Sequence, residues 1–179
     1  MDSNIGATTG GVIIPFSSGM TPLNLSSLLG GAVGPAVAVG SASNLPVMVN
    51  SGIIDLTGST SNVAFVVPRN GTITSLSGFF ANITNLSLIE TTLTIKGQLY
   101  QSEDPQSSLF VPVPGAMINL NPGLTGIVSV GQTLSGSLSG LAIPVAQGTR
   151  LMMVYSISTS GLSLAQNISG TIRGGLNIQ

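Results

Sequence analysis

The chain has 179 residues, of which 5% are charged, and its net charge is -1, whereas an ordinary soluble domain is roughly 25% charged. Its 41 Ser or Thr residues and 24 Gly replace the missing charge, and it contains no His and no Cys. These absences exclude Ser-His-Asp and Cys-His catalysis, Cys/His zinc sites, disulfides and thiol redox centres. We therefore expect no enzyme, metal or cofactor, and a single domain long enough to bury its own core.

Charge is also unevenly distributed along the chain. Residues 3–54 and 105–149 carry no charged side chain, and the four cations are far apart, so no basic stripe is available for a nucleic acid. The most apolar window, residues 28–40, contains Pro35 and is shorter than the roughly 20 residues that a membrane helix needs. It predicts a strand and a turn, without membrane insertion. The long uncharged segments predict burial between identical subunits; the alternative is a monomer coated in Ser, Thr, Asn and Gln, as in some surface-layer and adhesive proteins.

The first elements are a tail and a short helix. Residues 1–10 predict a flexible lead-in, and residues 11–179 predict one undivided domain. The segment Leu23–Leu29 is preceded by Thr-Pro and followed by Gly-Gly, a pattern typical of the start and end of one or two helical turns. No other segment predicts a helix.

The rest of the chain alternates with a period of two, which indicates strands. Residues 73–80 and 151–157 are apolar on both faces, which suits central strands covered twice. Residues 92–100 and 168–178 alternate apolar and polar, and residues 131–140 form a strand and a turn anchored by leucines. Turn sequences such as Asn-Gly and Pro-Gly separate these runs. We predict an antiparallel jelly-roll sandwich of about ten strands with little or no helix.

The acidic residues give two candidate sites, and for both we prefer a structural interpretation. Glu103-Asp104 is an adjacent pair in a turn, but Ca²⁺ takes about 6–8 oxygen ligands, so we expect a solvated turn. Asp55 and Glu90 would form a glycosidase pair only if folding brought them together. We expect isolated carboxylates instead.

The cations are also assigned structural roles. Lys96 lies on the polar side of an alternating strand and is expected at the surface, since a nucleophilic lysine needs a desolvated pocket. Arg69 lies in a tight Asn-Gly turn, where we expect it to pair with Asp55 or Glu90. Arg150 and Arg173 are candidates for bridging subunits. No residue is assigned to catalysis, a cofactor or a metal.

Two further sets of residues raise the question of sugars. The five Asn-X-Ser/Thr sequons are attributed to chance in a chain so rich in hydroxyls. Aromatic side chains could stack on a sugar, but the chain has only seven of them, so we expect them in the core. The residues concerned are Asn24, Asn70, Asn82, Asn85 and Asn167 for the sequons, and Phe79, Phe80, Tyr100 and Phe110 for the rings.

Five ordered motifs give the chain a family resemblance from Gly10 onward. They are GGVIIPFSSG at 10–19, IDLTG at 54–58, FVVPRNGTI at 65–73, QLYQS at 98–102, and IPV at 143–145 running to GTRL at 148–151. Together they resemble the C-terminal domain of the collagen-like exosporium glycoproteins of spore-forming bacteria. The resemblance implies a compact, trimeric jelly roll, similar to tumour-necrosis-factor and complement-type heads, at the tip of a collagen-like stalk on the spore surface. The stalk and its anchoring leader are absent from these residues, so the lead-in is interpreted as the end of a missing stalk.

The expected function follows from this resemblance and from the neutral surface. Three collagen strands need a common register before a triple helix grows, and a globular trimer at one end supplies it. We expect a non-enzymatic homotrimeric head on the exosporium that nucleates trimerisation and adheres to glycans or proteins of a host or environmental surface. The alternatives are a lectin-like carbohydrate-binding module on the same fold, and a self-assembling shell or pilus subunit, which predicts open polymers.

Overall fold

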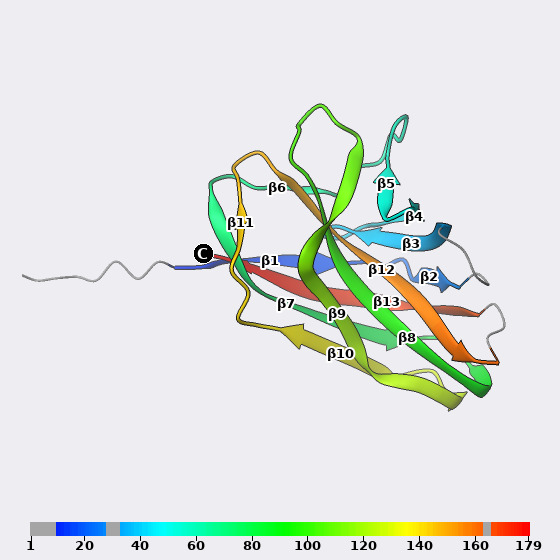
Figure 1. The fold of residues 1–179 in the computed structure, drawn as a ribbon. Coiled ribbons are helices and arrows are strands. Elements are labelled where there is room, and N and C mark those ends of the chain that lie inside the picture. Colours follow the sequence, from blue (N-terminus) through cyan, green and yellow to red (C-terminus); the bar gives the residue numbers. More distant parts are fainter. Residues whose placement is uncertain (1–9, 28–32, 163–165) are drawn as a thin grey trace, which may run out of the picture.

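The computed structural model describes residues 10–27, 33–162 and 166–179. These ranges contain thirteen strands and no helix, so none of their segments is a long apolar helix that could cross a membrane. The all-β prediction is confirmed, and residues 1–9 of the predicted lead-in lie outside the described residues. The strands are β1 (Val12–Ser17), β2 (Leu23–Ser26), β3 (Val33–Val39), β4 (Asn44–Asn50), β5 (Ile53–Asp55), β6 (Phe65–Val66), β7 (Gly71–Asn82), β8 (Leu86–Ser102), β9 (Leu109–Val128), β10 (Thr133–Leu138), β11 (Ile143–Val145), β12 (Arg150–Gly161) and β13 (Asn167–Ile178) (Figure 1).

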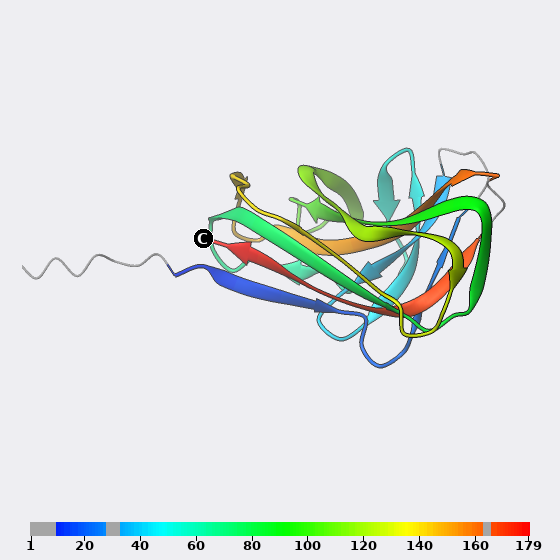
Figure 2. The same ribbon diagram turned by 90° about the horizontal axis from the view of Figure 1, so that it is seen from below.

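The strands form two layers, in which β1, β13 and β7 lie side by side in both ribbon views (Figures 1 and 2). Sheet A has the order β1-β13-β7-β10, with β2 also on β13 and β11 also on β7. Sheet B has the order β3-β12-β8-β9, with β6 also on β12. Every pair among these described strands is antiparallel, and Ser135 pairs with Asn121 to join β10 to β9. This order is compatible with the predicted jelly roll.

The main core lies between the two sheets and follows the predicted alternation. In β13, Ile168, Ile172 and Leu176 are buried, whereas Arg173 is exposed. Successive side chains of a strand point to opposite faces, so one face of β13 packs on sheet B and the other points outward from the molecule. The predicted one-sided strand at 168–178 is confirmed.

A second core lies on the opposite side of sheet B. Strands β3, β4, β5, β9, β8 and β12 pair in a closed ring, because β5 pairs with β9 and β3 with β12. Residues 151–155 of β12 are therefore buried on both faces, which confirms the predicted central strand there. The interior of the ring contains Ala36, Ala38, Val47, Ile54, Tyr100, Phe110, Met152 and Val154.

Two local predictions are wrong. Leu23–Ser26 is strand β2 and not a helical turn, because Leu23 and Leu25 both enter the core at a spacing of two while the strand pairs with β13; Leu28 and Leu29 lie outside the described residues. Residues 73–80 are not covered on both faces, since no described element packs over the outer face of β7. Phe79 is 41% exposed there.

Two glycines make room for Tyr155, a fully buried residue of β12: Gly78 lies in the facing sheet, and Gly97 lies in the neighbouring strand β8, where it pairs with Tyr155. A Cβ atom added at Gly78 would lie 3.0 Å from the Tyr155 hydroxyl, and one added at Gly97 would lie 2.8 Å from Cε1 of its ring. The hydroxyl has no hydrogen-bond partner in the part of the chain that the structure describes. Burial also raises the pKa of Tyr155, because the phenolate would lose its hydration.

Replacing Tyr155 by Phe should therefore stabilise the fold. We expect Tyr155→Phe to raise the free energy of unfolding at pH 7 by about 1 kcal/mol, measured by urea denaturation, because the unpaired hydroxyl is removed. Tyrosines of the unfolded chain ionise near pH 10 while Tyr155 of the native state stays protonated, so wild-type stability should fall as pH rises above about 10. The variant should lose less stability over that interval. A less stable variant at pH 7 would contradict this account.

Candidate interaction face

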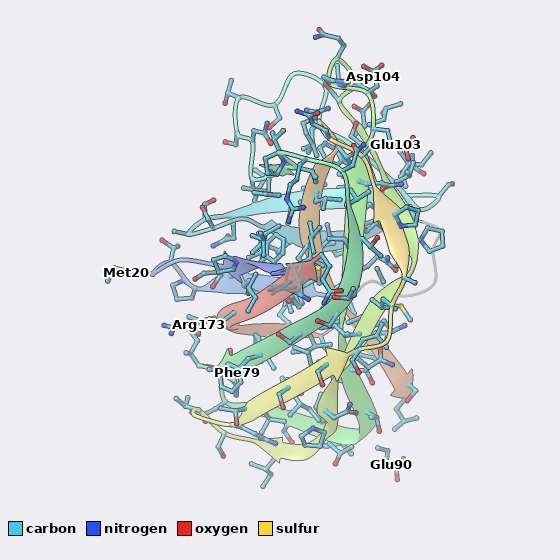
Figure 3. All side chains as sticks on the ribbon, turned by 90° about the vertical axis from the view of Figure 1, so that its left-hand side faces the viewer. Met20, Phe79, Glu90, Glu103, Asp104 and Arg173 are labelled. Atoms are coloured by element: carbon cyan, nitrogen blue, oxygen red, sulfur yellow. The ribbon has the colours of Figure 1, made fainter. Side chains whose placement is uncertain are left out.

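The fold separates the charged residues instead of gathering them. Seen from the end where β1 begins, Glu103 and Asp104 lie at one extremity of the molecule and Glu90 lies toward the other, while Arg173 and Phe79 lie together on one side (Figure 3). No group of three or more acidic residues that could hold a metal ion occurs in the described ranges. The acidic residues of the described ranges thus form no metal-binding cluster.

Asp55 and Asp104 are both used by their own turns. The backbone N–H of Thr57 donates to Asp55 Oδ1 at 2.8 Å, and the hydroxyl of Thr57, followed by this N–H, lowers the pKa of Asp55. Gln106 N donates to Asp104 Oδ1 at 2.8 Å. These bonds are typical of Asx turns, so both carboxylates stabilise loops. The expected pairing of Asp55 with Arg69 is not formed in the described residues.

Arg150 holds the loop between β8 and β9. Its guanidinium donates to Ser102 Oγ at 3.2 Å, to the carbonyl of Asp104 at 3.3 Å and to the carbonyl of Ser107. Its Cζ lies 5.1 Å from the centroid of the Phe110 ring, within the range of a cation–π contact. The Nη2 group of Arg150 is therefore used within the chain, whereas its buried Nε has no hydrogen-bond partner in the described residues. The sequence made this residue a candidate for bridging subunits.

Most sequon asparagines are structural. Asn82 is 1% exposed, and its amide donates to the carbonyls of Thr84 and Ser129 at 2.6 and 2.9 Å. Asn70 Oδ1 accepts from Gln147 N at 2.8 Å. Side-chain oxygens of Asn85 and Asn24 also accept hydrogen bonds, from Val130 N and Ser169 Oγ. These amides fix loops and strand ends.

The side of sheet A that points away from the core is almost uncharged, and we call it the outer A face. Strand register places Arg173, Phe79 and Ser135 in one row across β13, β7 and β10. Arg173 is the only charged side chain on this face. The face comprises Ile13, Pro15, Ser17, Ser75, Ser77, Phe79, Ala81, Thr133, Ser135, Ser137, Thr171, Arg173, Gly175 and Asn177.

The outer A face contains a hollow of about 660 Å³, which we call the A hollow. Its floor is the backbone of Gly174, Gly78 and Gly136, which pair with one another across β13, β7 and β10. Around it are Ser77, Phe79, Asn121, Ser135, Ser137 and Arg173. The hollow thus combines one cation and one aromatic ring with hydroxyl and amide groups.

A second feature lies at the end of the molecule opposite to the start of β1 and the end of β13 (Figure 1). Ile127 is 85% exposed and Ile89 is 73% exposed. Ile89 belongs to an irregular part of β8 in which Glu90 has a φ of 46°, and Leu162 N donates to the carbonyl of Glu90 at 3.1 Å. We call this apolar set the distal end; its members are Ile83, Ile89, Ile127, Val130 and Leu162.

Neither feature was identified from the sequence. The outer A face depends on which residues of distant strands share a row, and its polar small side chains resemble those of any solvated strand. The distal end combines residues from four separate segments. The only indication of the outer A face in the sequence was the lack of charge in two segments, which supply Ile13, Ser135 and Ser137.

Comparison with known proteins gives one informative relative. The chain is 31% identical over 182 aligned residues to Collagen-like protein 1 of Acanthamoeba polyphaga mimivirus, and the alignment covers 96% of this chain. It covers 19% of the viral protein, so the chain spans about one fifth of the length of this curated relative. No family model matches the chain. The chain is thus homologous to one segment of a collagen-like protein.

Removing the Arg150 side chain should loosen the loop that it holds. We expect Arg150→Ala to lower the free energy of unfolding by about 2 kcal/mol in urea denaturation, because hydrogen bonds to charged groups contribute roughly 1.5–3 kcal/mol. Arg69→Ala, which removes an exposed arginine from a turn, is the control and should change stability little. Equal effects of the two substitutions would show that Arg150 does not stabilise the loop.

Proposed function

We propose that the chain is a non-enzymatic, homotrimeric head domain of a collagen-like protein, and that copies meet on the outer A face. The homology of 96% of the chain to one segment of a collagen-like protein carries this proposal. A collagen triple helix contains three chains with Gly at every third residue. A head that brings three chains together would set their register.

The position of the ends supports this arrangement. Val12 at the start of β1 pairs with Ile178 at the end of β13, so a stalk preceding β1 would leave the head at one end. In a closed threefold ring, every copy has the same orientation along the axis. Three heads with parallel orientation would therefore deliver three stalk strands to the same end.

The outer A face is the best surface for the contact between copies. It carries one charge, and its small side chains allow a different surface of the neighbouring copy to approach closely, as a threefold ring requires. Interface cores are depleted of charged residues and enriched in aromatics, and Phe79 is an exposed aromatic residue of this face. On the opposite side of the main core, part of sheet B is covered by the second core.

The distal end would then point away from the stalk and supply the adhesive surface. Exposed apolar side chains gathered in one place are typical of protein-interaction sites. We place the head on an external surface with its apolar end outward. The relative that we found belongs to a virus, so the bacterial spore surface expected from the sequence stays a prediction.

The trimer is tested by the solution mass of the 179-residue chain, measured by light scattering coupled to size exclusion. We expect a sharp mass near three subunits. Ser77→Arg adds a second cation to the outer A face and should raise the concentration of half-dissociation about a hundredfold, since a buried unpaired charge is strongly destabilising. Ser160→Arg, at an exposed position of β12, is the matched control and should leave the trimer intact.

Other masses would favour the alternatives. A monomer at every concentration would contradict the proposed trimer and favour a lectin-like module on the same fold. Open polymers of indefinite mass would favour a self-assembling shell subunit. Equal disruption by Ser77→Arg and Ser160→Arg would place the contact elsewhere.

The adhesive role of the distal end is tested by binding to an apolar surface. We expect the double variant Ile89→Ser, Ile127→Ser to lose at least about tenfold in affinity for alkyl-coated beads, because burying one such side chain contributes roughly 1.5–3 kcal/mol. Met48→Ser, which removes an exposed apolar side chain of β4, is the control. Unchanged binding of the double variant would contradict an adhesive distal end.

A further inference from the structure

We propose that the A hollow binds a small oxyanion beside Arg173, enclosed when a second copy of the chain covers the outer A face. The inference rests on the proposed trimer and adds a ligand to its contact. The chemical class is a solute with a carboxylate, sulfate or phosphate group. Four observations about the hollow lead to it.

Strand register gives the A hollow its shape. Two rows of side chains cross the outer A face and are separated by the glycine row, in which Gly78 pairs with Gly174 and Gly136. Positions in this row face the core, since a Cβ atom at Gly78 would meet Ile118 and Tyr155, so the floor between the two outward rows is bare backbone. One row consists of Arg173, Phe79, Ser135 and Asn121, and the other includes Ser77 and Ser137.

Arg173 has no negative partner on this face. The side chain is exposed, and it forms no ion pair among the described residues. Glu103, Asp104 and Glu90 lie well away from Arg173 in the view along the molecule (Figure 3). Asp55 lies in β5, which belongs to the ring around the second core.

Covering this face would remove water from an unpaired guanidinium. Removing a charge from water is costly unless an opposite charge and hydrogen bonds replace the hydration. The outer A face supplies no carboxylate, so a small anion is the partner that its chemistry admits. Such an anion would strengthen the contact between copies, because it binds only the assembled state well.

The remaining groups of the hollow are donors that suit an oxyanion. The planar guanidinium presents two parallel N–H groups, which match two oxygens of a carboxylate, sulfate or phosphate. The hydroxyls of Ser77, Ser135 and Ser137 can donate to the other oxygens. Asn121 Nδ2 already donates to the carbonyl of Asn119 at 3.3 Å and has a second N–H available. Phe79 forms an apolar wall that excludes water.

The test measures the half-dissociation concentration of the trimer in buffers of equal ionic strength, with either chloride alone or a low millimolar concentration of sulfate. At that concentration the general stabilising effect of sulfate on folding is small. We expect sulfate to lower the half-dissociation concentration of the wild type at least about tenfold. Arg69→Gln, at an exposed arginine outside the outer A face, should respond like the wild type.

Variants at Arg173 identify the site. Arg173→Gln should show no response to sulfate, and in chloride it should form the trimer at lower concentration than the wild type, because the unpaired charge is gone. Arg173→Lys keeps the charge without the planar fork and should respond less than the wild type. Circular dichroism of each variant checks that it is folded.

The outcomes separate this inference from the proposed trimer. A trimer that does not respond to sulfate, or a response that persists in Arg173→Gln, would overturn the oxyanion site and leave the trimer standing. A weaker trimer of Arg173→Gln in chloride would show that a carboxylate of the neighbouring copy pairs with Arg173, which also overturns it. A chain that is monomeric throughout would defeat the proposed trimer and the enclosed site together.

Discussion

The structure depends on strands β12 and β8, which contribute side chains to both cores: residues 151–155 of β12 are buried on both faces, and the adjacent Leu99 and Tyr100 of β8 enter different cores. Tyr155 and Leu151 of β12 pack into the main core, while Met152 and Val154 of the same strand pack into the second core. The two cores therefore share one pair of strands, and neither can loosen without exposing the back of the other. This sharing lets a chain with few charges remain compact, since apolar burial on both sides of sheet B provides most of the favourable free energy.

The sequence predicted those features of the fold that depend only on residues close together in the chain. The alternation at 168–178 and the doubly apolar run at 151–157 each predicted the correct number of buried faces, because strand periodicity is a local property. The same reasoning failed at 73–80. Phe79 points outward there, and only a tertiary arrangement decides whether a face is covered. Leu23 and Leu25 were misinterpreted as helical because flanking Pro and Gly outweighed their spacing of two.

The second core and the outer A face could not be predicted from the sequence, for a different reason. Ile54 and Phe110 face each other through a pairing between strands that are far apart in sequence. Arg173 and Phe79 become neighbours only through the register of β13 against β7. Loop chemistry, by contrast, was only partly predictable. The Glu103-Asp104 turn is structural, as expected, but the predicted Asn-Gly hairpin turn is wrong: neither Asn70 nor Gly71 has a positive φ, and β7, which begins at Gly71, does not pair with β6. The role of Arg150 in the Glu103-Asp104 turn was not foreseen, because its partners are mainly backbone carbonyls.

The central position of β13 in sheet A has a consequence for the order in which this sheet can form. β13 follows the other twelve described strands along the chain, lies between β1 and β7 and contacts both. β1 and β2 come first in the chain, and β13 is their pairing partner in the described residues. On the ribosome these early strands therefore stay unpaired until the segment 167–178 has emerged. Pairing between segments so far apart in sequence forms slowly, because a long loop must close before any of its contacts are made.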